Sequence, residues 1–139
     1  MDPIEEILRN SNTIAVVGMS DDPIKPAHSV PAAMLHAGFR VIPVNPHHEE
    51  ILGLKVYPRL EDVPEPIDLV NVFRRPQFTP EVARQAVAVG AKALWLQTGI
   101  WSDEAREIAE SAGLRYVEDR CIRTERALYG ITKDGIPQK

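Results

Sequence analysis

The 139-residue sequence has one cysteine, no long apolar segment and no excess of positive charge. Its single cysteine, Cys121, excludes an internal disulfide and a cysteine-based metal cluster. No apolar run approaches the roughly 18 residues that a membrane-spanning helix needs. Residues 1–6 are acidic, whereas a secretory signal begins with positive charge. We therefore expect a cytoplasmic protein that has no membrane partner.

The charge balance bears on the class of partner. The chain has 16 Lys and Arg residues against 20 Asp and Glu residues, for a net charge of −4, which argues against a general nucleic-acid binder. Hydrophobic residues make up 44% and charged residues 26%, as in folded globular proteins. The length is that of one domain, and no linker or internal repeat divides it. We expect a single domain over residues 1–139 without a nucleic-acid partner.

Short apolar segments alternate with helical patterns along the chain. Short, largely apolar segments predict five strands, at residues 13–17, 40–44, 68–73, 93–96 and 114–117, and the first of them is mostly β-branched. Helical patterns lie before and between them, at residues 3–9, 30–37, 80–89 and 103–112. Because parallel strands are joined by right-handed crossovers, this order predicts an α/β fold with three layers. Its centre is a doubly wound, mainly parallel, five-stranded Rossmann-like sheet.

Three local expectations accompany this pattern. Pro31 is expected in the first turn of its helix, because proline disrupts a helix interior. Residues 51–54 are expected to form a brief helical turn. The segment beyond Gly130 is expected to be frayed.

Two nucleotide-binding motifs are incomplete or missing. The dinucleotide fingerprint G-x-G-x-x-G is reduced to Gly18, because Met, Ser, Asp, Asp and Pro follow it. The acidic residue that would hold a ribose hydroxyl at the end of the second strand is replaced by Asn45. No G-x-x-x-x-G-K-[ST] sequence occurs. NAD, FAD and P-loop chemistry are therefore disfavoured.

Small, polar or basic residues follow four of the five strands. Gly18 and Lys25 follow the first strand, residues 45–46 the second, residues 74–75 the third and residues 97–99 the fourth. The carboxyl ends of parallel strands meet at one edge of a sheet, where ligands bind. Lysine and arginine there suit a phosphate. We predict a pocket for a phosphate-bearing ligand, while each residue alone also suits a turn or a solvated surface.

Histidine and cysteine supply two weaker candidates. His47 and His48 are adjacent, but without a third ligand nearby no metal site is predicted. Cys121 follows the fifth strand on the ligand side of the sheet, and the neighbouring Arg120 favours a thiolate. No histidine pairs with this cysteine in the sequence. A packed, unreactive thiol is therefore the favoured interpretation, and a catalytic cysteine the weaker one.

The segments that end the strands resemble the CoA-binding domain family, whose fold is that of the N-terminal domain of the succinyl-CoA synthetase alpha subunit. The resemblance covers about residues 5–125 and rests on residues 14–20, 41–46, 70–75, 90–99 and 119–121. It implies coenzyme A or an acyl-CoA as the ligand, lying across the carboxyl ends of the strands. Two departures are Lys25, where similar sequences often have arginine, and Ile122, where proline often follows the Asp-Arg-Cys triplet.

The resemblance also implies which residues meet each part of the ligand. The phosphates would face Gly18, Met19, Ser20 and Lys25. The adenosine would lie against Val44, Asn45 and Pro46, with Phe73, Arg74 and Arg75 beside it. The pantetheine arm would contact Leu96, Gln97, Thr98 and Gly99.

The ligase chemistry of the synthetase is not expected here. Its phosphorylated histidine belongs to a second domain, and no residue of this sequence matches it. Binding of a small-molecule CoA ligand without catalysis is therefore the favoured function, and a protein partner stays open. One alternative is an enzyme or redox switch in which Cys121 exchanges an acyl group or a disulfide with CoA. Another is a regulatory domain that binds an NADH-type dinucleotide, which the missing glycines and Asn45 disfavour.

Overall fold

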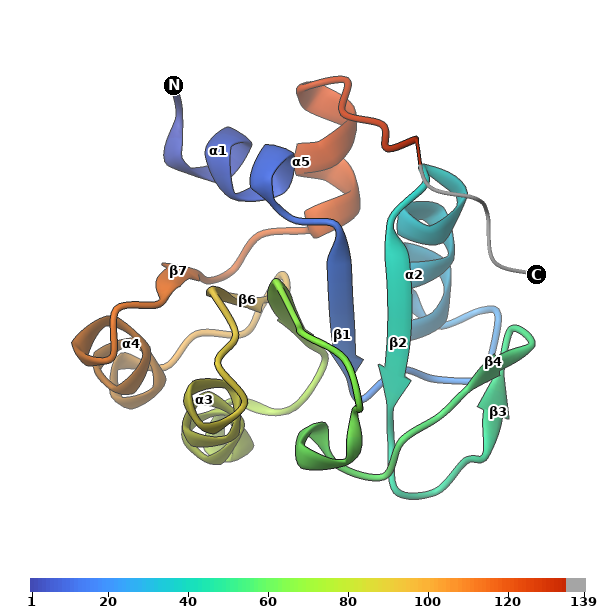
Figure 1. Cartoon of the computed structure of the whole chain (residues 1–139), viewed down its shortest axis with the longest axis horizontal. Helices are drawn as coiled ribbons and strands as arrows, with labels where there is room; N and C mark the ends of the chain where they lie inside the picture. The colour runs from blue at the N-terminus through green and yellow to red at the C-terminus, as the bar shows by residue number, and fades with distance from the viewer. Residues whose placement is uncertain (135–139) are drawn as a thin grey trace.

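The computed structural model describes residues 1–134 of the chain (Figure 1). Its strands are β1 (Thr13–Val17), β2 (Arg40–Val44), β3 (Glu50–Ile51), β4 (Leu54–Lys55), β5 (Leu69–Val72), β6 (Ala93–Leu96) and β7 (Arg115–Val117). Its α-helices are α1 (Pro3–Asn10), α2 (Pro26–His36), α3 (Thr79–Ala88), α4 (Asp103–Ser111) and α5 (Ile122–Leu128), with 3-10 turns η1 (Leu60–Asp62) and η2 (Pro76–Phe78).

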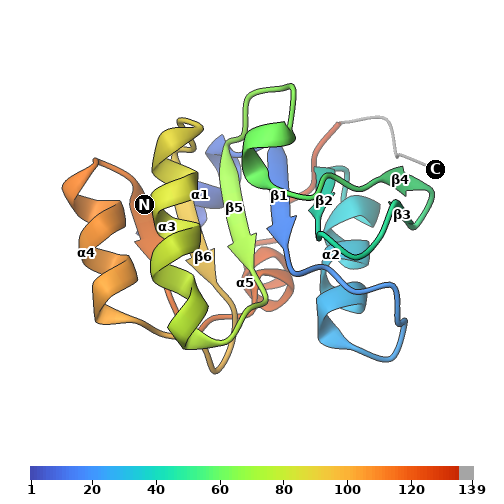
Figure 2. The same ribbon diagram turned by 90° about the horizontal axis from the view of Figure 1, so that it is seen from below.

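Five strands form one parallel sheet in the order β2-β1-β5-β6-β7. The strands are apolar because helices cover both of their faces. From β1 the chain passes to β2 on one side and returns to β5 on the other, with Val17 paired to Val44 and to Val72. The carboxyl ends of the strands lie along one edge (Figure 2). The order reverses between β1 and β5, where ligands bind in folds of this class.

Two helical layers enclose the sheet. Helices α1, α2 and α5 pack on one face, around Met34, Trp95 and Ile122. Helices α3 and α4 pack on the other face, around Ala83 and Leu94. Figure 2 shows α3 and α4 in front of the strands and α1, α2 and α5 behind them. The predicted three-layer, parallel, Rossmann-like α/β fold is confirmed.

Helix α2 begins earlier than predicted, at Pro26, and Pro31 lies inside it rather than in its first turn. Pro31 lacks the N–H that would bond to the Ala27 carbonyl. That carbonyl instead accepts a hydrogen bond from the Ser20 N–H at 3.1 Å. The freed carbonyl therefore fastens the β1–α2 turn to the helix.

Residues 50–55 form a hairpin, so the predicted helical turn at residues 51–54 is wrong. β3 and β4 pair antiparallel through Ile51 and Leu54. Leu52 and Gly53 between them have φ values of 55° and 72°, as a two-residue hairpin turn of type I′ requires. The hairpin lies beyond the β2 edge of the sheet (Figure 1).

The segment after β7 is more ordered than predicted. It forms α5, which the sequence patterns did not indicate, and then continues to the C-terminal end of α2. Ile131 is buried, and the Lys133 N–H donates to the Ala37 carbonyl at 2.8 Å. The expectation of fraying is therefore wrong for residues 131–134, and its remainder lies outside the described residues. None of the helices described is long and apolar enough to cross a membrane.

Candidate functional site

A groove runs along the carboxyl edge of the sheet, over β1, β2 and β5. It consists of two cavities of about 430 and 510 Å³ that share Gly18, Asn45 and Phe73 in their walls. We call the first the α3 cavity, because α3 bounds it, and the second the α2 cavity, because it lies at the start of α2. The groove occupies the point where the strand order reverses, at the edge of the sheet where ligands bind in folds of this class.

The α2 cavity is polar and has unpaired backbone donors. Helix α2 begins with Lys25 at its N-cap and has no side chain that caps its first amides. Within the described part of the chain, the N–H groups of Asp21 and Ala27 have no hydrogen-bond partner. Both residues line the cavity, and so does Lys25. A helix N-terminus with free amides and a lysine suits an anion such as a phosphate.

Hydrogen bonds within the β1–α2 turn fix the shape of this cavity. The Ser20 hydroxyl accepts from the Asp22 N–H at 3.0 Å, and the Asp22 carboxylate accepts from the Ile24 N–H at 3.0 Å. The His28 ring lies with Nδ1 2.8 Å from the Ser20 carbonyl. The Ser20 hydroxyl keeps its own proton available for a ligand. These hydrogen bonds stabilise the conformation of the turn.

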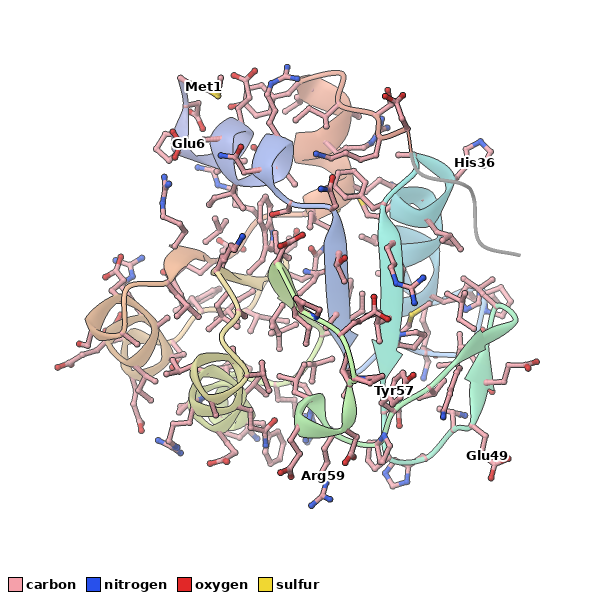
Figure 3. The ribbon with its side chains drawn as sticks, viewed as in Figure 1. Met1, Glu6, His36, Glu49, Tyr57 and Arg59 are labelled. Carbon is pink, nitrogen blue, oxygen red and sulfur yellow. The ribbon has the colours of Figure 1, made fainter. Side chains whose placement is uncertain are left out.

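The α3 cavity is mostly apolar. Side chains from strand ends, the segment after β4 and α3 form its walls, among them Val17, Val44, Pro46, Pro58, Phe73 and Val82. Six ionisable or amide side chains also line it: Asn45, His47, Arg59, Arg74, Glu81 and Gln85. The Arg74 guanidinium lies 4.4 Å from the centre of the Phe78 ring. Figure 3 shows Arg59 beyond the carboxyl end of β2. An apolar slot with cations at its margin suits a flat ring that carries a phosphate.

Asn45, which follows β2, connects the loop after β2 to the turn after β1. Its side-chain N–H donates to the Met19 carbonyl at 2.9 Å, and its Oδ1 accepts from the His47 N–H at 2.8 Å. The Gly18 N–H donates to the Val44 carbonyl at 2.9 Å. Asn45 therefore keeps one N–H and one lone pair for a ligand, and its main work is to hold the two loops together.

The predicted residues after β6 lie outside both cavities. Leu96 is fully buried, and Gln97 is 5% exposed. The Gln97 side-chain oxygen accepts from the Ile122 N–H at 2.9 Å and from the Asn71 amide at 3.3 Å. The Gly99 N–H donates to the Asp119 carboxylate at 2.7 Å. These groups thus connect β6 to the start of α5.

Cys121 lies at the N-cap of α5, half-buried beside Gln97. Burial by itself would raise the pKa of its thiol. Hydrogen-bonding groups of Thr124, Gln97 and Arg123 lower the pKa by more than burial raises it, so the pKa of the thiol lies below that of an ordinary cysteine. Backbone amides at a helix start and side-chain donors stabilise a thiolate. Among residues 1–134, no group of three or more His, Cys, Asp or Glu side chains could hold a metal ion.

The structure brings together most of the predicted site residues. The cavities are lined by Gly18, Met19, Ser20, Lys25, Val44, Asn45, Pro46, Phe73 and Arg74, and neither is lined by Arg75, Leu96, Gln97, Thr98 or Gly99. Met19 is fully buried. Sequence patterns missed the walls contributed by the segment after β4 and by α3, and also Asp21 and His48. The spacing of Val82 and Gln85 places them on one face of α3, but no sequence pattern places that face over the groove.

The sequence and the fold were compared with known proteins. The chain matches the family described as CoA binding domain over residues 12–127. The uncharacterized protein YneT of Bacillus subtilis is 42% identical over 125 residues, which are 90% of this chain and 93% of YneT. A hypothetical protein from Pyrococcus horikoshii OT3 has a similar solved structure, with a TM-score of 0.89 and 39% identity over 92% of each chain.

A longer enzyme also contains a similar segment. The ADP-forming acetate–CoA ligase II of Archaeoglobus fulgidus is 30% identical over 100 residues, which are 70% of this chain. The match covers only 15% of the ligase.

Proposed function

Because the chain belongs to the CoA-binding domain family, we propose that it binds coenzyme A or an acyl-CoA across the carboxyl ends of β1, β2 and β5, without chemistry of its own. The observation that carries this proposal is the joining of two unlike cavities at Gly18, Asn45 and Phe73. The polar α2 cavity suits phosphates, and the apolar α3 cavity suits an adenine ring. We propose that the diphosphate of the ligand lies in the α2 cavity and its adenine ring in the α3 cavity.

Basic side chains in the groove support an anionic ligand although the chain carries a net charge of −4 and three carboxylates, of Asp21, Asp22 and Glu81, line the same cavities. Lys25 lines the α2 cavity, while Arg59 and Arg74 line the α3 cavity. The field inside a groove depends on the charges of its walls rather than on the net charge. We propose that Lys25 faces the diphosphate and that the arginines, with Arg75 outside the cavity walls, lie near the 3′-phosphate.

The pantetheine arm would extend from the α2 cavity toward β6. Thr98 and Gly99 follow β6 on the same edge of the sheet and are exposed. Leu96 and Gln97 lie beneath them. We propose that the arm contacts this edge through the backbone after β6, because Leu96 is buried and the Gln97 oxygen already accepts two hydrogen bonds.

Calorimetry with CoA, acetyl-CoA, dephospho-CoA, NAD and ATP tests the proposal. We expect CoA to bind and NAD and ATP to bind much more weakly. Lys25→Ala should weaken CoA binding about tenfold, because a charge-assisted hydrogen bond to phosphate is lost. Lys92→Ala is the matched control, since Lys92 is exposed and pairs with Asp68 at the opposite edge of the sheet. Absence of CoA binding up to millimolar ligand would overturn the proposal.

A second candidate function is exchange at Cys121, which its lowered thiol pKa favours. In this reaction the thiolate attacks the disulfide of an oxidised CoA. A Cys121–CoA disulfide forms, the original disulfide breaks, and the second CoA leaves as a thiolate. Attack on an acyl-CoA would likewise form an acyl-Cys121 thioester and release the CoA thiolate.

The pH dependence of Cys121 alkylation tests the second candidate. Because the pKa of the thiol is lowered in the folded protein, the rate with iodoacetamide should reach half of its plateau at a lower pH than for a cysteine peptide. Mass spectrometry after incubation with CoA disulfide should show one adduct, absent from Cys121→Ser. A thiol that titrates like the peptide and forms no adduct would remove this candidate.

A further inference from the structure

Two amide side chains are buried between β5, β6 and the start of α5. Asn71 on β5 is 1% exposed, and Gln97, which follows β6, is 5% exposed. Asn71 Nδ2 lies 3.3 Å from Gln97 Oε1 and 3.4 Å from the Trp95 carbonyl oxygen. Within residues 1–134, the buried Asn71 Oδ1 has no hydrogen-bond partner. A buried acceptor without a partner costs stability, so this asparagine calls for a role other than packing.

The Gln97 amide is fixed in one orientation. Its Oε1 accepts from the Ile122 N–H at 2.9 Å as well as from Asn71. A backbone N–H is only a donor, so Nε2 cannot take the place of Oε1. The Asn71 amide is fixed in the same way, because the Trp95 carbonyl beside its Nδ2 is only an acceptor. The group that Gln97 can offer to a further partner is therefore the donor Nε2.

Cys121 lies next to this amide. The N–H group that Gln97 Oε1 holds belongs to the peptide bond between Cys121 and Ile122. Burial raises the pKa of the Cys121 thiol, and hydrogen bonds, among them one with the Gln97 side chain, lower the pKa by more. The charged residues of the same segment, Arg120 and Glu125, lie 3.9 Å from each other and have opposite charges. Hydrogen bonds therefore stabilise the thiolate here.

We infer that Gln97, oriented by Asn71, donates a hydrogen bond from Nε2 to Cys121 and stabilises the thiolate that attacks a disulfide or a thioester. Asn71 acts through Gln97 and is a positioning residue. This inference rests on the second candidate function and adds to it the side chain that acts on the reacting sulfur. A hydrogen bond to the ionised form of a group favours that form, and the thiolate is the nucleophile.

The experiment measures the rate of Cys121 alkylation by iodoacetamide in the whole chain between about pH 6 and pH 10. Gln97→Glu keeps an acceptor for Ile122 and Asn71 but lacks the donor, and Gln97→Met lacks the donor without adding charge. In both variants the rate at pH 7 should fall about tenfold, the effect of one hydrogen bond to a charged group. The pH at which the rate reaches half of its plateau should rise. The plateau itself should not fall, because every thiol is ionised there.

Asn71→Leu tests the positioning role. The change removes the donor that holds Gln97 together with the unpaired Oδ1, so the apolar replacement should leave the protein folded. The half-plateau pH should rise by less than in Gln97→Met, because the Ile122 N–H still holds Oε1. An unchanged half-plateau pH would show that Asn71 does not orient Gln97.

Gln77→Glu is the matched control. Gln77 is exposed in η2, which also follows a strand at the carboxyl edge of the sheet, so the same change of charge there should leave the half-plateau pH unchanged. A rise in Gln97→Glu but not in Gln97→Met would assign the effect to the added charge and would overturn the inference. A lower plateau with an unchanged half-plateau pH would also overturn it, because access to the thiol and not its ionisation would have changed. Circular dichroism confirms that the variants are folded.

The wild-type profile separates this inference from the function on which it rests. If the wild-type thiol ionises at a lower pH than a cysteine peptide and both Gln97 variants match the wild type, the inference fails and exchange at Cys121 stands. If the wild-type thiol titrates like the peptide, both fail. The measurement contains no CoA, so calorimetry with CoA decides the binding proposal independently.

Discussion

Gly18→Ala is expected to lower the free energy of unfolding by roughly 3 kcal/mol or more and to abolish CoA binding. Gly18 has a φ of +85°, and an added Cβ would lie 2.5 Å from the Phe73 carbonyl oxygen. That oxygen cannot move alone, because the Phe73 N–H bonds to the Val17 carbonyl at 2.9 Å and holds β5 to β1. Both cavities share Gly18 and Phe73, so the displacement would deform both. Urea unfolding and calorimetry with CoA measure the two effects.

Gly90→Ala separates backbone strain from the close contact. Gly90 has a similar φ of +76°, but a Cβ there would meet no atom within 4 Å. This variant should lose only about 1–2 kcal/mol, the cost of the left-handed conformation. Equal losses in the two variants would show that the contact with Phe73 contributes nothing.

The fold was predictable wherever a strand is buried on both faces. The mostly β-branched run at residues 13–17 coincides with β1, and the apolar run Ala-Leu-Trp-Leu at residues 93–96 coincides with β6. Each run is short, apolar and followed by a turn residue, so periodicity and turn chemistry agree. Because these strands alternate with helices, the expected topology is a parallel sheet with right-handed crossovers and helices on both of its faces. Local sequence was sufficient because burial of these strands is nearly complete.

The errors arose where tertiary contacts override local rules. Pro31 lies inside α2 because the Ala27 carbonyl that it leaves unpaired finds the Ser20 N–H, a contact between a helix and a preceding turn. The segment at residues 51–54 is too short for its apolar pattern to distinguish a helical turn from a hairpin. Helix α5 has seven residues, which is less than two turns and too few for a periodic pattern.

The candidate site was predictable at the strand ends and unpredictable at its rim. Gly18, Asn45 and Phe73 follow strands directly, so the parallel sheet alone brings them together. Arg59 follows a hairpin that was not predicted, and Gln85 lies on a helix that was predicted but could not be placed over the groove. His48 was considered only as a metal ligand, because its partner Asp21 is 27 residues away in the sequence and meets it only in the folded chain.

Gly38→Ala is expected to detach the segment after α5 and to lower the free energy of unfolding by about 2–4 kcal/mol. Gly38 has a φ of +97°, and an added Cβ would lie 2.1 Å from the Lys133 carbonyl oxygen. The segment would lose the bond from the Lys133 N–H to the Ala37 carbonyl and the bond from its ammonium group to the Arg9 carbonyl. Ile131, which is 2% exposed, would lose its burial. Hydrogen exchange of the amides at residues 131 and 133 and urea unfolding measure the result.

A double-mutant cycle with Ile131→Ala tests whether the steric contact acts through this segment. Each single change weakens the same docked segment, so the double variant should lose clearly less than the sum of the two. Gly113→Ala is the matched control, because Gly113 also follows a helix with a positive φ of +86° but has no atom within 4 Å of an added Cβ. Its effect should be about 1–2 kcal/mol, the cost of the left-handed conformation, and should add to that of Ile131→Ala. Full additivity between Gly38→Ala and Ile131→Ala would contradict the prediction, because it would mean that the two residues stabilise the protein independently.

Helix α2 begins at the α2 cavity and ends at this segment. CoA affinity measured in Gly38→Ala and in the double variant therefore shows whether binding depends on the far end of the helix. We expect a change of less than threefold, because the hydrogen bonds that shape the cavity all lie within the β1–α2 turn, the first turn of α2 and the loop after β2.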